Sequence, residues 1–431
     1  MDTAKGNSKF MFIGFSYILL QPFLDLLTSL SLHLFEKDLT ISLLTRMIFL
    51  IFAGIYLLFF SRLYQKNVFL YFGILFIFFV IQLMINHSYK PTFHLFEELK
   101  YMVKLIYFVV VLIFYYVLFK QIPPYQNKTI HYLVYASTII GLIMLVSGMT
   151  GTAFSSYEGG KEGNVGWFYA GNELGAILAM SFPIVVLSAL LKSRKFWISA
   201  ALLIYSLLAL GTKVGYGAIV MVLVIALIMS TYNHFLHKKN WGSIVILVLF
   251  LICTIAYTPF SPLAHNLNIH LSWLGVGNQT NKIEHVTNEQ VENLVYSGRE
   301  KFLSDQKQFY LAAPLSQKLF GMGYGGNYQK NAKLIEMDFY DVFFSFGMIG
   351  VVLYFIPIVF LVIRLFNVAG MNLFRYINTQ NALMITGIIL GFGISFTAGH
   401  VLTAPAVSIY LALLLSYFVV NLEQMDEMKK V

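Results

Sequence analysis

The stretch YMVKLIYFVVVLIFYYVLF, residues 101–119, contains one charged residue, Lys104. About 20 predominantly apolar residues are what an α-helix needs to cross the hydrocarbon core of a bilayer. The whole chain of 431 residues shares this character, because 58% of it is hydrophobic and only 11% is charged. Soluble chains have roughly 45–50% and about 25%. The composition predicts an all-α polytopic membrane protein and excludes a soluble enzyme, a disordered protein and a disulfide-rich secreted domain.

Hydropathy predicts about 12 membrane-spanning helices. The first is too long for the apolar core of a signal peptide and has no evident small-residue cleavage site, so we expect it to be retained. Lysine and arginine gather in alternate connections, which by the positive-inside rule places both chain ends in the cytoplasm. The expected spans are 10–34, 42–61, 68–86, 101–119, 132–149, 172–191, 197–210, 214–231, 242–257, 339–363, 382–398 and 401–420.

This topology divides the chain into three parts. Residues 1–257 contain helices one to nine, residues 258–338 form a large external loop, and residues 339–431 contain the last three helices and a cytoplasmic tail. Within the loop, an amphipathic helix is expected between a cap at Thr287 or Asn288 and a stop at Pro314. This helix either lies on the membrane or over a cavity, or it only packs on the outer ends of the bundle. Its apolar residues are Val291, Leu294, Val295, Phe302 and Phe309.

Ionisable residues of the predicted spans gather in the outer half of the membrane. Charged groups inside a bilayer are costly and tend to mark a functional interior. A proton or ion pathway needs polar groups through the whole thickness, so this distribution predicts a cavity that opens outward and is closed below. For Lys104 and Asp25, the alternative is that the side chains only reach the lipid headgroups. The residues in this outer half are Asp25, Arg46, Lys104, Glu173, Lys213, Asp338, Asp341 and His400.

These residue types suit the transfer of a sugar chain from a polyprenyl diphosphate to a hydroxyl group. Cations can hold the diphosphate through charge-assisted hydrogen bonds, and a carboxylate or imidazole can take the proton of the attacking hydroxyl. The leaving group already carries its phosphates, so no nucleotide site is needed. The candidate cations are Arg46, Lys213 and Arg299, and the candidate proton acceptors are Glu336, Asp338 and His400.

Other motifs argue against cofactors and metals. GMGYGG, residues 321–326, formally matches GxGxxG, but no strand–turn–helix unit surrounds it, so we interpret it as a flexible or tight turn. No Walker A or HExxH sequence occurs, the ten histidines are scattered, and the single cysteine, Cys253, has no disulfide partner. The net charge of +9 lies in short runs between the spans. We therefore expect no cofactor, no metal and no nucleic-acid partner.

Three short stretches carry a resemblance to a known family. They are GNELG at residues 171–175, GTKVG at residues 211–215, and Glu336-Met-Asp338 leading into Gly347-Met-Ile-Gly350. Their order, the 12-span plan and the large loop before the tenth span resemble the superfamily of O-antigen ligases and Wzy-type polymerases of bacterial envelope polysaccharide synthesis. The resemblance covers most of the chain and implies a metal-independent, inverting glycosyl transfer within a GT-C-like helical bundle.

The resemblance also assigns roles to residues. Arg299 matches a loop arginine thought to engage the lipid diphosphate, and Lys213 stands where the family has an arginine. Glu336 occupies the position of the ligase histidine, which makes it the first candidate for the base. The remaining candidates are His400 as the second base, Asp338 as an orienting partner, and Asn172 and Glu173 as supporting residues.

The sequence thus predicts a membrane glycosyltransferase that polymerises or transfers oligosaccharide units carried on undecaprenyl or a similar polyprenyl diphosphate, at the outer face of the bacterial cytoplasmic membrane. Expected partners are this lipid-linked oligosaccharide, a glycan acceptor, membrane lipids, a flippase and a chain-length regulator. The alternatives are a ligase with a different acceptor, a flippase or transporter, and a scaffold subunit. The missing ligase histidine favours a polymerase. The sequence does not determine the sugar, the linkage, the acceptor or the oligomeric state.

Overall fold

The computed structural model is built almost entirely of α-helices. In the described part of the chain, eleven helices are long and apolar enough to cross a membrane, and α7 (Phe196–Ala209) is a shorter apolar helix. The prediction of an all-α polytopic membrane protein is therefore confirmed. The structure describes residues 2–35, 41–61, 63–121, 126–157, 161–191, 193–237, 241–273, 298–329, 332–370 and 376–430.

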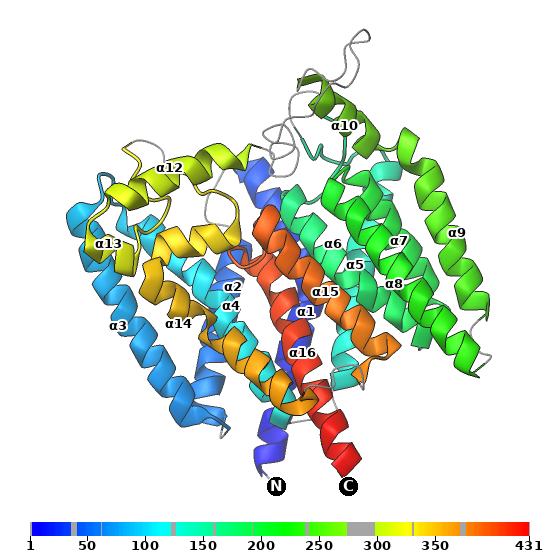
Figure 1. Ribbon diagram of the computed structural model, residues 1–431, viewed down its shortest axis with the longest axis horizontal. Helices are drawn as coiled ribbons and strands as arrows, with labels where there is room; N and C mark the ends of the chain where they lie inside the picture. Colours follow the sequence, from blue (N-terminus) through cyan, green and yellow to red (C-terminus); the bar gives the residue numbers. More distant parts are fainter. Residues whose placement is uncertain are drawn as a thin grey trace.

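The long helices form one bundle, with both chain ends at the same end of it (Figure 1). Three short helices, α10 (Pro262–Trp273), α12 (Arg299–Ala312) and α13 (Leu315–Phe320), lie at the opposite end, which we call the distal end. The long helices are α1 (Asp2–Phe35), α2 (Ile41–Ile55), α3 (Gln65–Tyr89), α4 (Leu95–Gln121), α5 (Gln126–Met149), α6 (Gly171–Leu191), α8 (Lys213–His237), α9 (Trp241–Tyr257), α14 (Asp338–Ala369), α15 (Thr379–Thr397) and α16 (Pro405–Lys430).

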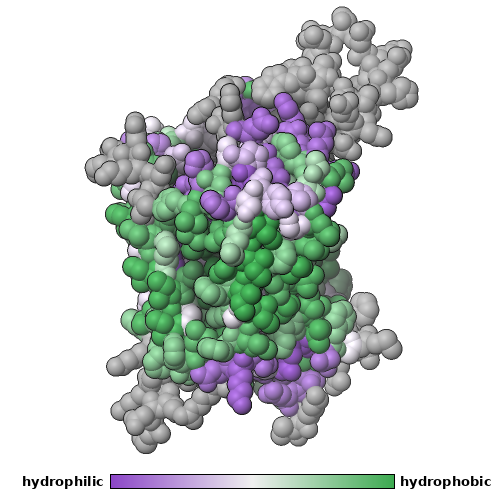
Figure 2. Space-filling model, turned by 90° about the vertical axis from the view of Figure 1, so that its left-hand side faces the viewer, coloured by the Kyte–Doolittle hydropathy of each residue, from purple (hydrophilic) through white to green (hydrophobic). Residues whose placement is uncertain are grey.

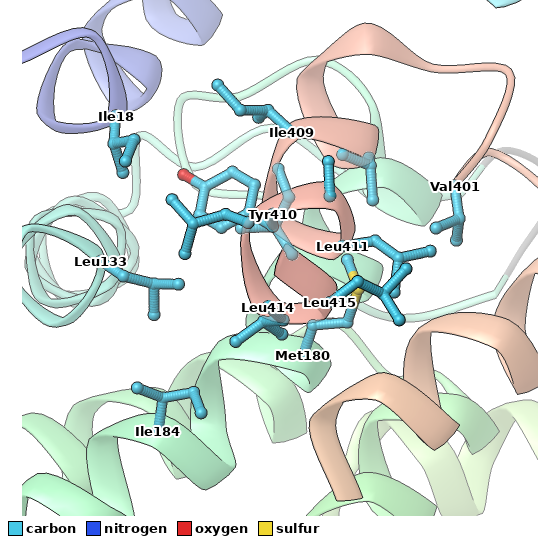
Figure 3. Packing of buried hydrophobic residues seen from close by; sticks show 14 of the residues in the cluster. Ile18, Leu133, Met180, Ile184, Val401, Ile409, Tyr410, Leu411, Leu414 and Leu415 are labelled. Carbon is cyan, nitrogen blue, oxygen red and sulfur yellow. The ribbon is translucent and has the colours of Figure 1, made fainter. Parts of the chain in front are cut away.

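The last helix, α16, lies at the centre of the bundle. In its apolar window 94% of the residues are buried, against 17% in α9, which faces outward. Helix α16 packs most extensively against α4, and it also contacts α6, α14 and α15. Figure 3 shows Tyr410, Leu411 and Leu414 of α16 among Met180 of α6 and Ile18 of α1. The apolar window of α9 is the more hydrophobic of the two, and lipid can cover it, so the central position of α16 follows from its packing against neighbouring helices.

The surface of the bundle matches the bilayer. Figure 2 shows a continuous hydrophobic band between two hydrophilic ends. Exposed side chains such as Phe59, Phe76 and Ile252 contribute to the apolar surface of the outer helices. In a soluble protein, an exposed apolar surface of this extent would be a liability. Here it is the surface that lipid covers.

Helix α14 departs from the predicted uninterrupted span over 339–363. Gly347 interrupts it with φ 66° and ψ −171°, so the segment before Gly347 and the segment after it run in different directions (Figure 1). The break leaves carbonyl groups without helical partners. The loop after α13 supplies the missing donors, because Met322 N–H donates to Phe344 O at 2.9 Å and Gly323 N–H donates to Ser345 O at 3.1 Å.

The glycine-rich stretch 321–326 is this capping loop. Gly321, Gly323, Gly325 and Gly326 all have positive φ, so of the two expected alternatives, a flexible or a tight turn, the structure shows the tight one. A Cβ at Gly321 would overlap with the carbonyl of Ser345, and a Cβ at Gly323 would meet the Glu98 carboxylate. The glycines therefore allow the loop to lie against the backbone of α14 and the side chain of Glu98.

The predicted amphipathic helix is found in part. Residues 287–295 lie outside the described residues, whereas α12 spans Arg299–Ala312 and ends just before Pro314, as expected. Phe302 and Phe309 pack against a small second core that includes Phe344 of α14. The described part of this helix thus packs on the distal end of the bundle, which was the second of the two alternatives.

Replacing Gly321 by alanine tests the loop contact. The new Cβ would meet the Ser345 carbonyl, and alanine would also have to adopt φ 89°, which costs about 1–3 kcal/mol by itself. We expect a clear fall in the melting temperature of the detergent-purified protein. Gly217→Ala on α8 is the control, since its Cβ would meet no heavy atom within 4 Å. Equal melting temperatures for the two variants would contradict this account of the loop.

Candidate functional site

A cavity of about 430 Å³ lies toward the distal end of the bundle. It is formed by α1, α2, α4, α6, the glycine-rich loop and the turn that precedes α16. Its volume is within the range of about 300–1,000 Å³ that is usual for small-ligand sites. The charged and titratable side chains that line it are Asp25, Arg46, Glu97, Lys100, Tyr101, Lys104, Tyr169, Glu173, Tyr324 and His400.

The three cations of this cavity differ in their partners. Arg46 on α2 forms a buried ion pair with Asp25 on α1, and Lys100 lies 3.6 Å from Glu97. Lys104 has no carboxylate within ion-pair distance among the described residues. Lys104 and Asp25 both line the cavity, so neither side chain simply extends toward the headgroups as the alternative held.

Glu173 enters the cavity from the first turn of α6. The preceding residues Phe168, Tyr169 and Ala170 also line it, so the chain follows the cavity wall before the helix begins. A carboxylate in the first turn of a helix is favoured by the helix dipole. Asn172, predicted as a second supporting residue, is exposed and does not line the cavity.

Asp338 organises the turn that carries His400. Its side chain is fully buried and accepts hydrogen bonds from the backbone N–H groups of His400 (3.0 Å), Val401 (2.8 Å) and Leu402 (2.7 Å). It also accepts from the hydroxyl groups of Ser395 (3.0 Å) and Thr403 (2.7 Å). Both carboxylate oxygens are therefore occupied. Asp338 does not line the cavity, and it orients His400 through the backbone.

Asp341 performs the same task for the turn that carries Glu336. It accepts from the N–H groups of Ile335 at 2.8 Å and Met337 at 3.1 Å. Glu336 has φ 65° and His400 has φ 60°, a left-handed conformation that costs about 1–3 kcal/mol for residues other than glycine. The two aspartates stabilise these strained turns, and such strain tends to occur at functional sites.

Glu336, His400 and Arg299 come together at one edge of the cavity. Arg299 donates to Glu336 Oε2 at 3.3 Å, and His400 Nε2 lies 3.7 Å from the same oxygen. Of the three, only His400 lines the cavity. The structure thus brings together three predicted residues that are up to 101 positions apart in the sequence. The assignment of Glu336 as the base stays a prediction.

The pair of Glu336 and His400 changes both pKa values. The nearby imidazole of His400, together with the other positive charges, outweighs burial and lowers the pKa of Glu336. Burial alone would lower the pKa of His400, but the nearby carboxylates of Glu336 and Glu173 raise it above the ordinary value. The pair therefore favours an ionised carboxylate beside a protonated imidazole.

Lys213 lies apart from the other predicted cations. It is the first residue of α8, is partly buried, and has Lys161 as an electrostatic neighbour. It does not line the cavity. The backbone of Gly211 just before it packs closely against Pro262 and Asn266 of α10. Its predicted role in holding a diphosphate is therefore not supported by proximity to the cavity.

Glu97, Lys100 and Tyr101 line the cavity, although none of them is among the predicted site residues. Together with Lys104, these residues follow the spacing i, i+3, i+4 and i+7 on α4, which places them on one helical face. A polar stripe of this kind at the start of an otherwise apolar span was the available signal. The predicted span began at residue 101 and so left out the first two residues, although α4 begins at Leu95.

The chain matches the model of a known protein family. The family model described as O-antigen ligase like membrane protein matches residues 7–285 and 275–425. The chain belongs to this family. A comparison with curated proteins finds no match. The resemblance inferred from the short motifs is confirmed for the family, and the chain is a multi-pass membrane protein of the O-antigen ligase-like type.

Asp338→Asn tests the support of the His400 turn. Asparagine keeps one acceptor oxygen but turns an amide group toward backbone donors, so at least one hydrogen bond to a charged group, worth about 1.5–3 kcal/mol, is lost. We expect faster amide hydrogen exchange at residues 400–402. Asp341→Asn is the matched control, because it should loosen residues 335–337 instead. Unchanged exchange at 400–402 would argue against the role of Asp338.

The pKa shifts predict how stability depends on pH. The raised pKa of His400 adds stability that is complete below the unfolded pKa of histidine and is lost as pH rises through the folded value. The lowered pKa of Glu336 adds stability above the unfolded pKa of glutamate, which is lost as pH falls through the folded value. The contact is therefore strongest in weakly acidic solution.

Melting temperatures of the wild type and His400→Gln between about pH 5 and about pH 9 measure this contact, since the window brackets the ordinary pKa of histidine near 6.5. The wild type should be the more stable protein at the acidic end, and the difference should shrink as pH rises. A difference that stays constant across the range would show that His400 does not contribute through its charge.

Proposed function

We propose that this protein is a membrane glycosyltransferase that transfers or polymerises a glycan carried on a polyprenyl diphosphate. The observation that carries this proposal is the cavity at the distal end, in which Lys104 has no carboxylate partner among the described residues and lies with Arg46 and Lys100. A cation left without a protein counterion in a partly dry cavity is suited to an anionic ligand. Membership of the O-antigen ligase-like family supports a glycan as the group transferred.

In this proposal Lys104 and Arg46 hold the diphosphate. Arg46 can turn from Asp25 toward the ligand, or bind with the guanidinium nitrogen Nε, which is buried and has no hydrogen-bond partner among the described residues. Arg299 binds at the edge of the cavity, where it already contacts Glu336. Lys213 does not line the cavity. It could contact the ligand only if the ligand extends beyond the cavity.

The chemistry is the displacement of a diphosphate by a hydroxyl group. Negative charge grows on the diphosphate as its bond to the sugar breaks, and fixed cations stabilise that charge in the transition state. Phe168, Tyr169 and Tyr324 provide aromatic surfaces along the cavity that suit the faces of sugar rings. The proposed reaction needs no nucleotide and no metal, because the leaving group and its counterions are already present.

The proposed location is the bacterial cytoplasmic membrane, with the distal end facing outward. Both chain ends then lie in the cytoplasm, as the distribution of lysine and arginine predicts. A lipid-linked glycan would reach the cavity after another protein has moved it across the membrane. A flippase and a chain-length regulator are therefore the proposed partners.

The first test is an assay with purified protein in liposomes, a polyprenyl-diphosphate oligosaccharide and no nucleotide sugar. A ladder of longer glycans identifies a polymerase, and transfer only to an added second acceptor identifies a ligase. Movement of the lipid-linked glycan across the bilayer without any product would contradict the proposal and favour a flippase.

Lys104→Met should reduce the rate of glycan transfer about 10²–10³-fold, the usual cost of removing one group that stabilises transition-state charge. Lys307→Met is the control, because Lys307 is an exposed lysine of α12 that does not line the cavity. The two variants make the same change of charge. Equal activity of the two would show that the cavity is not where the diphosphate binds.

A further inference from the structure

The carboxylates that line the cavity are not equivalent. Asp25 is paired with Arg46, and Glu97 lies 3.6 Å from Lys100. Glu173 also lines the cavity, and no cation among the described residues is within ion-pair distance of it. A carboxylate that already balances a cation is a weak proton acceptor, because its negative charge is stabilised. Among the carboxylates that line the cavity, Glu173 is the one without an ion-pair partner among the described residues.

The acidic residues near the cavity edge are committed to other contacts. Glu336 accepts from Arg299 and lies 3.7 Å from His400, and these contacts lower its pKa. Asp338 and Asp341 use their oxygens to hold backbone N–H groups. Asp338 and Asp341 would have to break an existing hydrogen bond before they could accept a proton from a ligand. Glu336 is a weak proton acceptor because Arg299 and His400 beside Oε2 stabilise its negative charge.

His400 lines the cavity but is poorly suited to be the base. Its pKa is raised by Glu336 and Glu173, so it carries a proton under conditions in which a free histidine is neutral. A protonated imidazole can donate a hydrogen bond or stabilise negative charge, and it cannot take a proton. This leaves Glu173, on the neighbouring wall, as the proton acceptor that faces the ligand.

We propose that Glu173 is the general base of this site, in place of Glu336 or His400. The inference rests on the glycosyl transfer proposed above and names the residue that activates the acceptor. The charged groups that surround Glu173 are His400 from the turn before α16, Arg46 from α2, Asp25 from α1 and Lys104 from α4. The base thus shares the cavity lining with the cations that hold the diphosphate and with the imidazole of His400.

The step balances as a single displacement. The hydroxyl oxygen of the acceptor gives its proton to a carboxylate oxygen of Glu173 and forms a bond to the anomeric carbon. The bond between that carbon and the diphosphate oxygen breaks, and the electron pair leaves with the diphosphate, next to Lys104 and Arg46. Glu173 then releases the proton to solvent. Attack from the side opposite the leaving group inverts the anomeric carbon.

The experiment compares Glu173→Gln, Glu336→Gln and the control Glu162→Gln in the liposome assay, with kcat and KM measured against pH. Glu162 lies at the same end of the molecule, with 59% of its side chain exposed. Glu173→Gln should lower kcat about 10²–10⁴-fold, the range for loss of a general base. Its KM for the lipid-linked glycan should stay equal or fall, because a negative charge has left a site for an anionic ligand.

The pH profile separates a base from a structural residue. In the wild type and in Glu173→Asp, which keeps the carboxylate, kcat should rise with pH through the titration of one group. In Glu173→Gln that rising limb should be absent, while elution in gel filtration and lipid-linked glycan binding match the wild type. Glu336→Gln should retain the limb and lose less in kcat than Glu173→Gln.

Two results would overturn the inference in distinguishable ways. Near-normal kcat in Glu173→Gln together with an inactive Glu336→Gln would return the base to Glu336 and leave the glycosyl transfer intact. A fall in kcat that comes with weaker binding and an unchanged pH profile would make Glu173 a structural residue. Absence of any glycan transfer by the wild type would overturn both the proposed function and this inference.

Discussion

The buried carboxylate of Asp338 is the contact on which the geometry of the site depends. It starts α14 and at the same time binds three successive N–H groups of the turn between α15 and α16. A buried carboxyl group is stable only when its oxygens are hydrogen-bonded, and this turn supplies the donors. The same bonds hold His400 with φ 60°, close to Glu336 and facing the cavity. Asp338 thus connects the start of α14 to the turn that precedes α16.

The glycine-rich loop fixes the position of α14 itself. Its backbone replaces the helical hydrogen bonds that the break at Gly347 removes. On its other side, Lys90 and Glu98 form a buried ion pair that also binds the backbone of Tyr324, with Tyr324 N–H donating to Glu98 at 2.8 Å. Polar backbone that lies away from water must be paired, and the loop finds partners on α14, α12, α3 and α4. The loop can therefore lie against the bundle and close one side of the cavity.

The central helices explain why the charges of the cavity differ in availability. Helices α4 and α6 both pack against α16, so Lys104 and Glu173 are held at the cavity by the apolar packing of their helices. Asp25 and Arg46 satisfy one another between α1 and α2. A site that retains one uncommitted cation and one uncommitted carboxylate is prepared for a ligand that brings negative charge and a reacting proton, and such preorganisation is how fixed charges accelerate a reaction.

The sequence by itself determined that the protein lies in a bilayer, that it is helical, and where most of the spans are. Runs of about 20 apolar residues form few structures other than membrane helices. It also determined the family, through the short motifs around Glu173, Lys213 and Glu336. It did not determine the break at Gly347, the approach of the loop 321–326, or the separation of Lys213 from the cavity. These features depend on contacts between residues more than 20 positions apart, such as Gly321 with Ser345 and Asp338 with His400. Hydropathy reports only how deep a residue lies. The helix packing decided which residues of equal depth face one another, and therefore which charges form the site.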